Sequence, residues 1–378
     1  MATKSLAIAM FIVVVSTFVV LGKSSPLLSQ ESDEDHKIPD IISNSKEFIL
    51  EEKEAKSGDY CGGKDIVKTI IVNQHGSSSN NGTFTRIQDA IDSIQVNNNR
   101  WVKIYIHAGT YKEKVDVRMN KPCIVLEGEN RHNTIVTYGD HQKTDTSATF
   151  TSSPSNVVVT GITFKNSFNV RLRREIKDEI EEEGKILPAV AARIYGNNTA
   201  FYKCGFIGYQ DTLFDIIGNH YFKKCYIQGE VDFIFGNGQS FYENCVINAT
   251  GGELPGFVTA QSRNKSTDEG GFVFERGHVL GSGKINLGRA WGLYSRVIFH
   301  GTYFESIITP QGWNAWDHVG QEDKFTYAEV NCKGPGSNTK DRVKWEKKLN
   351  YSDMQKFSLS SFVNKDGWLQ NLPISLNS

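Results

Sequence analysis

The sequence lacks an excess of either charge. Its 378 residues include 42 lysines and arginines against 43 aspartates and glutamates, so the formal net charge is −1. Without a basic surplus, we expect neither nucleic acid nor an anionic membrane surface as a partner. The chain is nevertheless long enough to bury a large core, either as one domain or as two smaller ones.

Long apolar runs are also missing beyond the first residues, so we expect no later segment to span a bilayer. The one such run, Leu6 to Leu21, follows Lys4 and precedes a Gly-Lys-Ser sequence. This order is typical of a secretory signal peptide, which we assign to residues 1–23, with an uncleaved anchor as the alternative. Five N-x-S/T sequons agree with secretion. They begin at Asn81, Asn197, Asn248, Asn264 and Asn350.

The domain organisation follows from composition. Residues 24–60 are polar and charged, and we interpret them as a flexible segment that precedes one domain, residues 61–378. Near its start, Val67–Val72 is a predicted strand. Thr83–Ile94 has the spacing of a helix, with Thr83 or Thr85 as its cap.

The rest of the chain is a series of short strand-like runs separated by Gly, Asn and Ser turns. These runs are Cys123–Glu127, Val157–Phe164, Ala200–Ile207, His220–Ile227, Gln239–Ile247, Gly271–Leu280 and Arg296–Phe304. Asp211 and Asp232 are 21 residues apart, and so are Cys204 and Cys225. A repeat of this length predicts an all-β fold, a right-handed parallel β-helix with short helices near its ends. A β-sandwich is the alternative, but it gives no reason for residues to repeat in register.

Two features bear on this repeat. A charged insertion at residues 171–183 interrupts it, and we interpret the insertion as a loop between coils.

Cys204 and Cys225 would lie on neighbouring coils, and they are our first choice for a disulfide in an oxidising compartment. The alternative is a stack of buried, unpaired thiols. The other cysteines are Cys61, Cys123, Cys245 and Cys332.

The same interval brings two carboxylates together. Neighbouring strands lie about 4.8 Å apart, so Asp211 and Asp232 would be close on successive coils. Two adjacent carboxylates do not ionise equally easily, so one can carry a proton while the other acts as nucleophile or base. The alternative, that both cap turns, fits Asp232 poorly because its neighbours in Val-Asp-Phe-Ile-Phe are apolar. Arg289 is the candidate cation for Asp232, and Trp291 could offer a flat surface to a sugar.

Five segments between residues 65 and 372 resemble the signature motifs of plant pectin methylesterases. They are Gly109-Thr-Tyr-Lys-Glu, Gly208-Tyr-Gln-Asp-Thr-Leu-Phe, Val231-Asp-Phe-Ile-Phe-Gly, Leu287-Gly-Arg-Ala-Trp and Gly312-Trp-Asn-Ala-Trp. Five motifs in order are far more specific than any one of them. The resemblance implies a right-handed parallel β-helix that hydrolyses the methyl esters of pectin and releases methanol. It implies no cofactor and no metal.

The resemblance also implies roles for single residues. Asp232 would be the nucleophile and Asp211 the general acid and base, while Gln210 would stabilise the oxyanion and Arg289 would orient Asp232. The residues expected to contact the sugars are Arg289, Trp291, Trp313, Phe214 and Phe235. We further expect a secreted monomer of the plant cell wall, with pectin and a proteinaceous pectinesterase inhibitor as partners.

Three positions depart from the family's pattern. Pro188 replaces a glutamine that would be a second oxyanion donor, Ala290 replaces a proline, and Asp145 stands near an expected aromatic residue. Losing one oxyanion donor can cost roughly 10²–10³ in rate. A pectin-binding protein without activity is therefore one alternative. A β-helix polygalacturonase or pectate lyase is another, although we find no acidic cluster for Ca²⁺ beside the two aspartates.

Overall fold

The computed structural model describes residues 60–76, 82–141, 143–169, 186–252 and 254–376, all within the unit Pro39–Ser378. The predicted signal peptide, the segment before residue 60 and the insertion at 171–183 lie outside these residues. No helix in the described ranges is long and apolar enough to cross a membrane.

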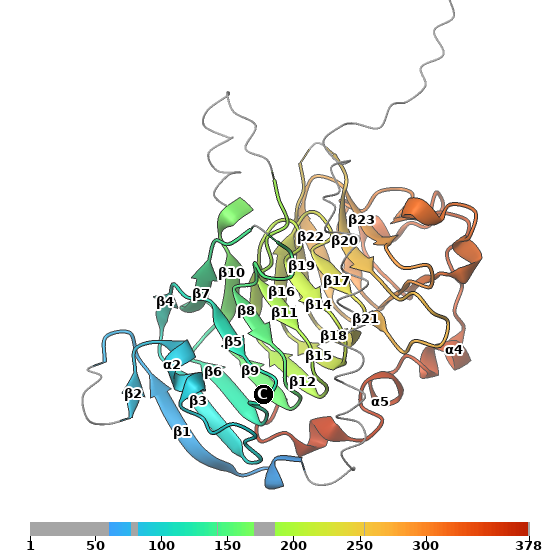
Figure 1. Cartoon of the computed structure of the whole chain (residues 1–378). Helices are drawn as coiled ribbons and strands as arrows, with labels where there is room; N and C mark the ends of the chain where they lie inside the picture. The colour runs from blue at the N-terminus through green and yellow to red at the C-terminus, as the bar shows by residue number, and fades with distance from the viewer. Residues whose placement is uncertain (1–59, 77–81, 142, 170–185, 253, 377–378) are drawn as a thin grey trace, which may run out of the picture. The chain divides into compact units, whose positions relative to one another are not determined.

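Short strands stack into three parallel sheets, called A, B and C here (Figure 1). Sheet A has 11 strands: β2 (Thr83–Phe84), β1 (Ile66–Val72), β3 (Trp101–Ile106), β6 (Ile124–Gly128), β9 (Val157–Thr160), β12 (Thr199–Tyr202), β15 (Asn219–Lys223), β18 (Gln239–Glu243), β21 (Gly271–Glu275), β24 (Arg296–His300) and β27 (Thr326–Val330). Sheet B has eight: β25 (Tyr303–Phe304), β22 (His278–Ser282), β19 (Val246–Thr250), β16 (Tyr226–Gly229), β13 (Gly205–Ile207), β10 (Thr163–Asn166), β7 (Thr134–Tyr138) and β4 (Gly109–Tyr111). Sheet C also has eight: β26 (Trp313–Asn314), β23 (Ile285–Ala290), β20 (Gly256–Gln261), β17 (Ile234–Gly236), β14 (Leu213–Asp215), β11 (Ala192–Ile194), β8 (Phe150–Ser152) and β5 (Val115–Val117).

From β3 onward the chain visits the three sheets in rotation, so each coil adds one strand to every sheet. A strand pairs with the strand three elements later, as Phe201 does with Phe222 and Leu213 does with Ile234. Both pairs are 21 residues apart, which is the interval of the sequence repeat. The parallel β-helix predicted from that repeat is therefore confirmed.

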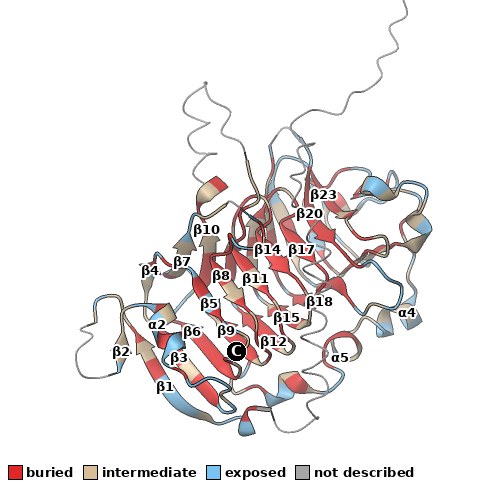
Figure 2. Cartoon of the chain, viewed as in Figure 1, coloured by how far each residue is buried: buried red, intermediate tan, exposed pale blue. Residues whose placement is uncertain are grey.

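Several predicted strand runs turn out to contain two strands and a corner. Val157–Phe164 covers β9 and β10, with Gly161 at φ 68° between them. Ala200–Ile207 covers β12 and β13, with Lys203 at φ 50° near the corner. A corner this short leaves little trace in an apolar pattern, because the residues on both sides of it are buried (Figure 2).

The interior is filled by side chains stacked from coil to coil. Phe201 stacks on Phe222 with ring centroids 5.1 Å apart, and Phe222 stacks on Tyr242 at 4.5 Å. Stacked rings of this kind add about 0.5–1.5 kcal/mol per pair beyond the burial of their area. The stacked rings therefore stabilise one pairing register of the coils, and this register also places the two aspartates on matching turns.

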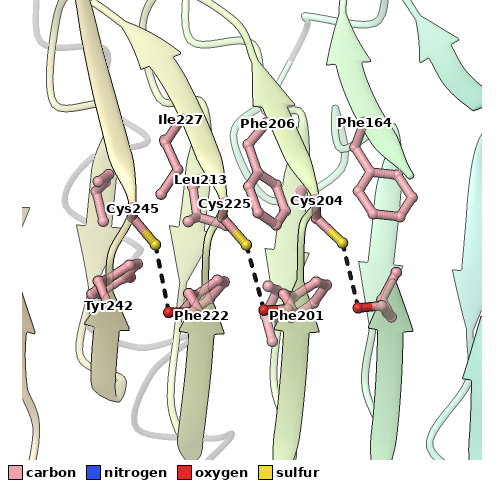
Figure 3. Packing of buried hydrophobic residues seen from close by; sticks show 14 of the residues in the cluster. Phe164, Phe201, Cys204, Phe206, Leu213, Phe222, Cys225, Ile227, Tyr242 and Cys245 are labelled. Atoms are coloured by element: carbon pink, nitrogen blue, oxygen red, sulfur yellow. Dashed lines mark hydrogen bonds between the residues drawn. The ribbon is translucent and has the colours of Figure 1, made fainter. Parts of the chain in front are cut away.

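The predicted Cys204–Cys225 disulfide is wrong. Both thiols are free and buried, whereas Cys61 and Cys123 form a disulfide with Cα atoms 5.5 Å apart. Cys204 and Cys225 each donate to a backbone carbonyl of the preceding coil, with sulfur–oxygen distances of 3.4 Å (Figure 3). Residues at equivalent points of two coils point the same way, whereas a disulfide needs side chains that converge. Burial raises the pKa of both thiols well above the ordinary value.

Apart from the two helical residues Phe168 and Asn169 after β10, the helices of the described chain lie near its two ends. They are α2 (Ile87–Asp92), α4 (Tyr351–Gln355) and α5 (Leu359–Phe362), with short 3-10 turns η3 (Tyr60–Gly62), η4 (Trp316–His318), η5 (Glu322–Lys324), η6 (Pro335–Ser337) and η7 (Trp368–Asn371). The expected threonine caps of the first helix are wrong, because Arg86 stands at its N-cap and makes no side-chain cap bond. The Glu113 carboxylate instead accepts from the backbone N–H groups of Ile87 and Gln88 at 2.9 and 3.1 Å.

Candidate active site

Asp211 and Asp232 occupy equivalent turns of neighbouring coils. Each lies two residues before a strand of sheet C, β14 and β17 respectively. Gln210 and Val231 form a parallel bridge, and the Asp211 N–H donates to the Val231 carbonyl at 3.1 Å. The two aspartates are therefore neighbours at the spacing of adjacent strands, about 4.8 Å. Both are buried, with 8% and 6% of their surface exposed.

Both aspartates have a left-handed backbone, with φ of 61° for Asp211 and 48° for Asp232. Aspartate tolerates this region better than most residues because its short polar side chain can bond locally. Lys203 and Lys224 adopt the same conformation at another corner of the coil. The left-handed backbone at the two aspartates is thus the conformation that this fold also uses at other corners, and here it presents carboxylates.

Arg289 lies on β23, a later strand of sheet C, and its guanidinium binds the Asp232 carboxylate. Its Nε is 2.9 and 3.0 Å from the two carboxylate oxygens, and its Nη2 contacts Oδ2. The side chains are only 18% and 9% exposed, so water screens the pair weakly. A fork contact of this kind stabilises the Asp232 carboxylate as an anion and fixes its orientation.

Two aromatic rings hold the guanidinium of Arg289. Its central carbon lies 3.3 Å from the ring centroid of Trp316 and 4.8 Å from that of Phe257. Neither ring was assigned to the site from the sequence, although Trp316 was noted within its motif. The pairing of strands in the folded protein was needed to show which tryptophan of Gly312-Trp-Asn-Ala-Trp contacts Arg289.

The expected sugar contact by Trp313 is wrong. Trp313 is 2% exposed and stacks on Tyr327 at 4.5 Å inside the helix. It pairs with Gly288, while its neighbour Asn314 pairs with Arg289. Since successive residues of a strand face opposite sides, an outward Arg289 requires an inward Trp313. A β-carbon at Gly288 would lie 2.2 Å from the Thr259 hydroxyl oxygen, so a glycine is needed here for the packing against Thr259.

Direct sugar contacts by Phe214 and Phe235 are also contradicted, because their exposed fractions are 0% and 2%. The two rings stack at 4.3 Å in the row that leads to Arg289. Phe235 in turn contacts Trp291, with ring centroids 6.1 Å apart. The two phenylalanines therefore support Trp291, which is itself partly exposed.

The departures at Pro188 and Ala290 have different consequences. Ala290 is the last residue of β23, is 1% exposed and pairs with Gln261, so Arg289 keeps a strand conformation. Pro188 precedes Ala189, whose N–H donates to the Gln210 carbonyl at 3.3 Å. Pro188 thus stands on the coil next to Gln210, where it offers no side-chain hydrogen bond.

This surface defines a class of protein: a carbohydrate-active hydrolase built on a parallel β-helix. Paired carboxylates, one of them held by a guanidinium, are the kind of groups that can supply a nucleophile and a proton carrier, and Trp291 offers a ring at the same surface. Within the described ranges, no group of three or more His, Cys, Asp or Glu is placed to hold a metal ion.

The chain belongs to the pectinesterase family. The family model named Pectinesterase matches residues 69–366. Probable pectinesterase 55 of Arabidopsis thaliana is 46% identical over 309 residues, which cover 81% of this chain and 91% of that protein. Probable pectinesterase 29 of the same plant is 45% identical over 309 residues, covering 81% and 90%.

Solved structures agree with this family. The pectin methylesterase from carrot matches with a TM-score of 0.73 and 29% identity, covering 81% of this chain and 97% of that one. The deglycosylated Aspergillus niger enzyme matches with a TM-score of 0.68 and 25% identity, covering 82% and 98%. The predicted family, enzyme class and right-handed parallel β-helix are confirmed.

The two rings in contact with Arg289 give a first prediction. Trp316→Ala is expected to lower kcat for methanol release about tenfold, because a partly desolvated cation–π contact contributes about 1–2 kcal/mol and Arg289 would lose its fixed position. Trp316→Phe keeps a ring face and should lose less. Initial rates on highly methylated pectin measure both. Equal losses in the two variants would show that the ring face does not position Arg289.

Proposed function

We propose that this chain hydrolyses pectin methyl esters with Asp232 as the nucleophile and Asp211 as the general acid and base. The observation that carries the proposal is the fork contact of Arg289 with Asp232, one coil from Asp211. A carboxylate attacks only as an anion, and the guanidinium stabilises that form. Family membership supports the substrate, a galacturonate methyl ester within pectin.

The reaction runs in two halves. The Asp232 carboxylate attacks the ester carbonyl, and the Gln210 amide donates to the oxyanion that forms. Asp211 gives its proton to the departing methoxide, so methanol leaves and an acyl-enzyme anhydride remains. Asp211 then takes a proton from water. The resulting hydroxide attacks the galacturonyl carbon of the anhydride, which restores the Asp232 carboxylate and frees a galacturonic acid group that then ionises in water.

Methanol release from highly methylated pectin by the purified protein tests this function. We expect methanol with no new reducing ends and no unsaturated products, because only the ester bond is broken. New reducing ends would instead indicate a polygalacturonase, and unsaturated products a pectate lyase. Either result in place of methanol would contradict the proposal.

A second candidate function rests on Pro188. Without a second side-chain donor at this position, the chain could bind pectin without turning it over. The same assay separates the two candidates when it is paired with a pectin co-sedimentation measurement. Binding without methanol from the wild-type protein would favour the binding function over the enzyme.

We further propose secretion to the plant cell wall, as a monomer, with the signal peptide removed. The Cys61–Cys123 disulfide supports this location, because such bonds persist in oxidising compartments. Two of the sequons, Asn264 and Asn350, have exposed side chains. A proteinaceous pectinesterase inhibitor is a further proposed partner.

A further inference from the structure

Six residues with a left-handed backbone form a row at the corner where the chain passes from sheet A to sheet B. Each stands two residues before a strand of sheet B, and their φ values lie between 50° and 68°. In chain order they are Gly161, Lys203, Lys224, Asn244, Arg276 and Gly301. Lys203 comes before β13 whereas Asp211 comes after it, so this corner is at the other edge of sheet B from the paired aspartates.

Hydrogen bonds between coils keep this row in register. The Lys203 N–H donates to the Lys223 carbonyl at 2.9 Å, and the Lys224 N–H donates to the Glu243 carbonyl at 2.9 Å. Because both bonds join the same two positions of successive coils, Lys203 and Lys224 occupy equivalent points at the strand spacing of about 4.8 Å. Strands β12 and β15, which lead into them, are neighbours in sheet A (Figure 1).

The two lysines are unusual residues for such a corner. Glycine tolerates a left-handed backbone because it has no β-carbon, and asparagine does so because its short amide can bond locally. Gly161, Asn244 and Gly301 follow this rule, whereas lysine has neither property. A residue that breaks the local preference of the backbone points to a use for its side chain. At this corner the side chain supplies a positive charge.

Three cations meet at this corner. The Nζ atoms of Lys203 and Lys224 lie 4.9 and 5.9 Å from the ring centroid of Tyr202, so one ring contacts both ammonium groups. Arg131, in the loop between β6 and β7, donates from Nη1 to the Lys224 carbonyl at 2.8 Å. We call Arg131, Lys203 and Lys224 the corner patch.

The charges of the corner patch have one sign and follow the axis of the β-helix. Like charges held close together repel one another and favour an anionic ligand. Lys203 and Lys224 are exposed on successive coils, so the ligand that matches them is an extended polymer with repeated acidic groups rather than a single small anion. Arg276 is left out of the patch, because its guanidinium contacts the Glu243 and Glu275 carboxylates at 2.8 and 3.0 Å.

Free galacturonate units are the acidic repeat that the proposed reaction itself provides. Hydrolysis of the methyl esters leaves carboxylates, so the product is a linear polyanion that forms beside the enzyme. We propose that the corner patch binds de-esterified pectin, as a contact separate from the ester-hydrolysing site. The inference rests on the proposed function for the identity of the polymer, because that reaction makes it.

Such a contact would keep the enzyme on the polymer between turnovers. Binding at two places on one polymer raises the effective concentration of the remaining esters near Asp211 and Asp232, with no change in the chemistry. The patch should therefore lower KM for long, partly de-esterified pectin and leave kcat unchanged. Fully methylated trigalacturonate, which has no free carboxylate, should not benefit.

The double variant Lys203→Asn/Lys224→Asn tests the patch with a change that the fold accepts. Asparagine suits the left-handed corner, as Asn244 shows on the next coil, so the variant should keep the wild-type melting temperature. The probe is polygalacturonate, measured by calorimetry at low ionic strength. We expect the wild-type protein to bind it and the variant to have a Kd about tenfold higher, since two exposed charge contacts of a few-fold each are lost. Lys340→Asn is the matched control, because Lys340 is an exposed lysine in the loop after η6, and it should leave the Kd unchanged.

Two further measurements separate the patch from the ester-hydrolysing site. Added salt should weaken polygalacturonate binding more in the wild-type protein than in the double variant, because salt screens exposed charges. The kcat and KM for fully methylated trigalacturonate should be the same in both proteins, since this ligand offers no carboxylate to the patch.

An unchanged Kd in the folded double variant would overturn the proposal, and so would tighter wild-type binding to phosphatidylserine vesicles than to polygalacturonate. If the double variant does not fold by circular dichroism, Lys224→Asn alone provides the test and should raise the Kd about threefold. Absence of methanol from the wild-type protein would sink the proposed function alone, because the binding measurement needs no turnover.

Discussion

Asp232→Asn is expected to lower kcat for methanol release by about 10⁴-fold. Removing a nucleophile or its partner in a covalent hydrolase costs roughly 10⁴–10⁶ in kcat. An amide is a far poorer nucleophile than a carboxylate, and it cannot attract the positive charge of Arg289. The loss should fall on kcat and leave KM nearly unchanged, since the sugar contacts remain. Initial rates of methanol release over a range of pectin concentrations measure both parameters.

The control for this variant is Asp317→Asn. Asp317 lies in η4 next to Trp316, but it is exposed. It should therefore keep wild-type activity. Thermal unfolding is needed as well, because removing one partner of a buried ion pair costs about 3–5 kcal/mol, and less where the pair is partly exposed as here. A folded Asp232→Asn protein with a tenth of wild-type turnover would rule out Asp232 as the nucleophile.

Gln210→Ala is expected to lower kcat by about 10²–10³-fold. This is the usual cost of one oxyanion donor, and the chain has no second side-chain donor at Pro188 to share the charge. KM should change little, because the oxyanion exists only along the reaction path. Gln228→Ala is a suitable control: Gln228 lies on the neighbouring coil, in β16, and its amide oxygen accepts from the Tyr226 hydroxyl at 2.8 Å.

Pro188→Gln, introduced into the wild-type protein and into Gln210→Ala, tests whether a second oxyanion donor is missing from the site. If Pro188 is the weak point of the site, the new glutamine should raise kcat about tenfold and recover part of the loss in Gln210→Ala. The two changes concern adjacent coils, so their effects should not add. No gain in either background would mean that the second donor is supplied elsewhere or is unnecessary.

The sequence predicted the fold well because a solenoid repeats its contacts. Asp211 and Asp232 could be placed side by side from their 21-residue interval alone, since each coil copies the path of the last. The same regularity misled the disulfide prediction. It brings Cys204 and Cys225 to matching points, but it also makes their side chains parallel, which the interval does not reveal.

The second limit on prediction from the sequence was the question of which residues of a strand face the interior. Whether Trp313 faces the interior depends on its pairing with Gly288. The two residues are 25 positions apart in the chain, and the loops between them have irregular lengths, so the sequence does not fix this pairing. One residue of slip would exchange the faces of Trp313 and Asn314. The Glu113 cap of α2 was missed for a similar reason, because the cap comes from a segment that the chain reaches 26 residues later.

The order of strands in the three sheets also decides where the molecule can open. In a solenoid each coil contacts only its neighbours, so stability is close to a sum of coil and interface terms, and local opening starts at the ends. Asp211 and Asp232 precede β14 and β17, which are the fifth and fourth strands from the β26 end in a sheet of eight. Fraying at the β5 end would therefore leave Asp211, Asp232 and Arg289 assembled, whereas fraying at the β26 end would first separate Arg289 on β23 from Asp232.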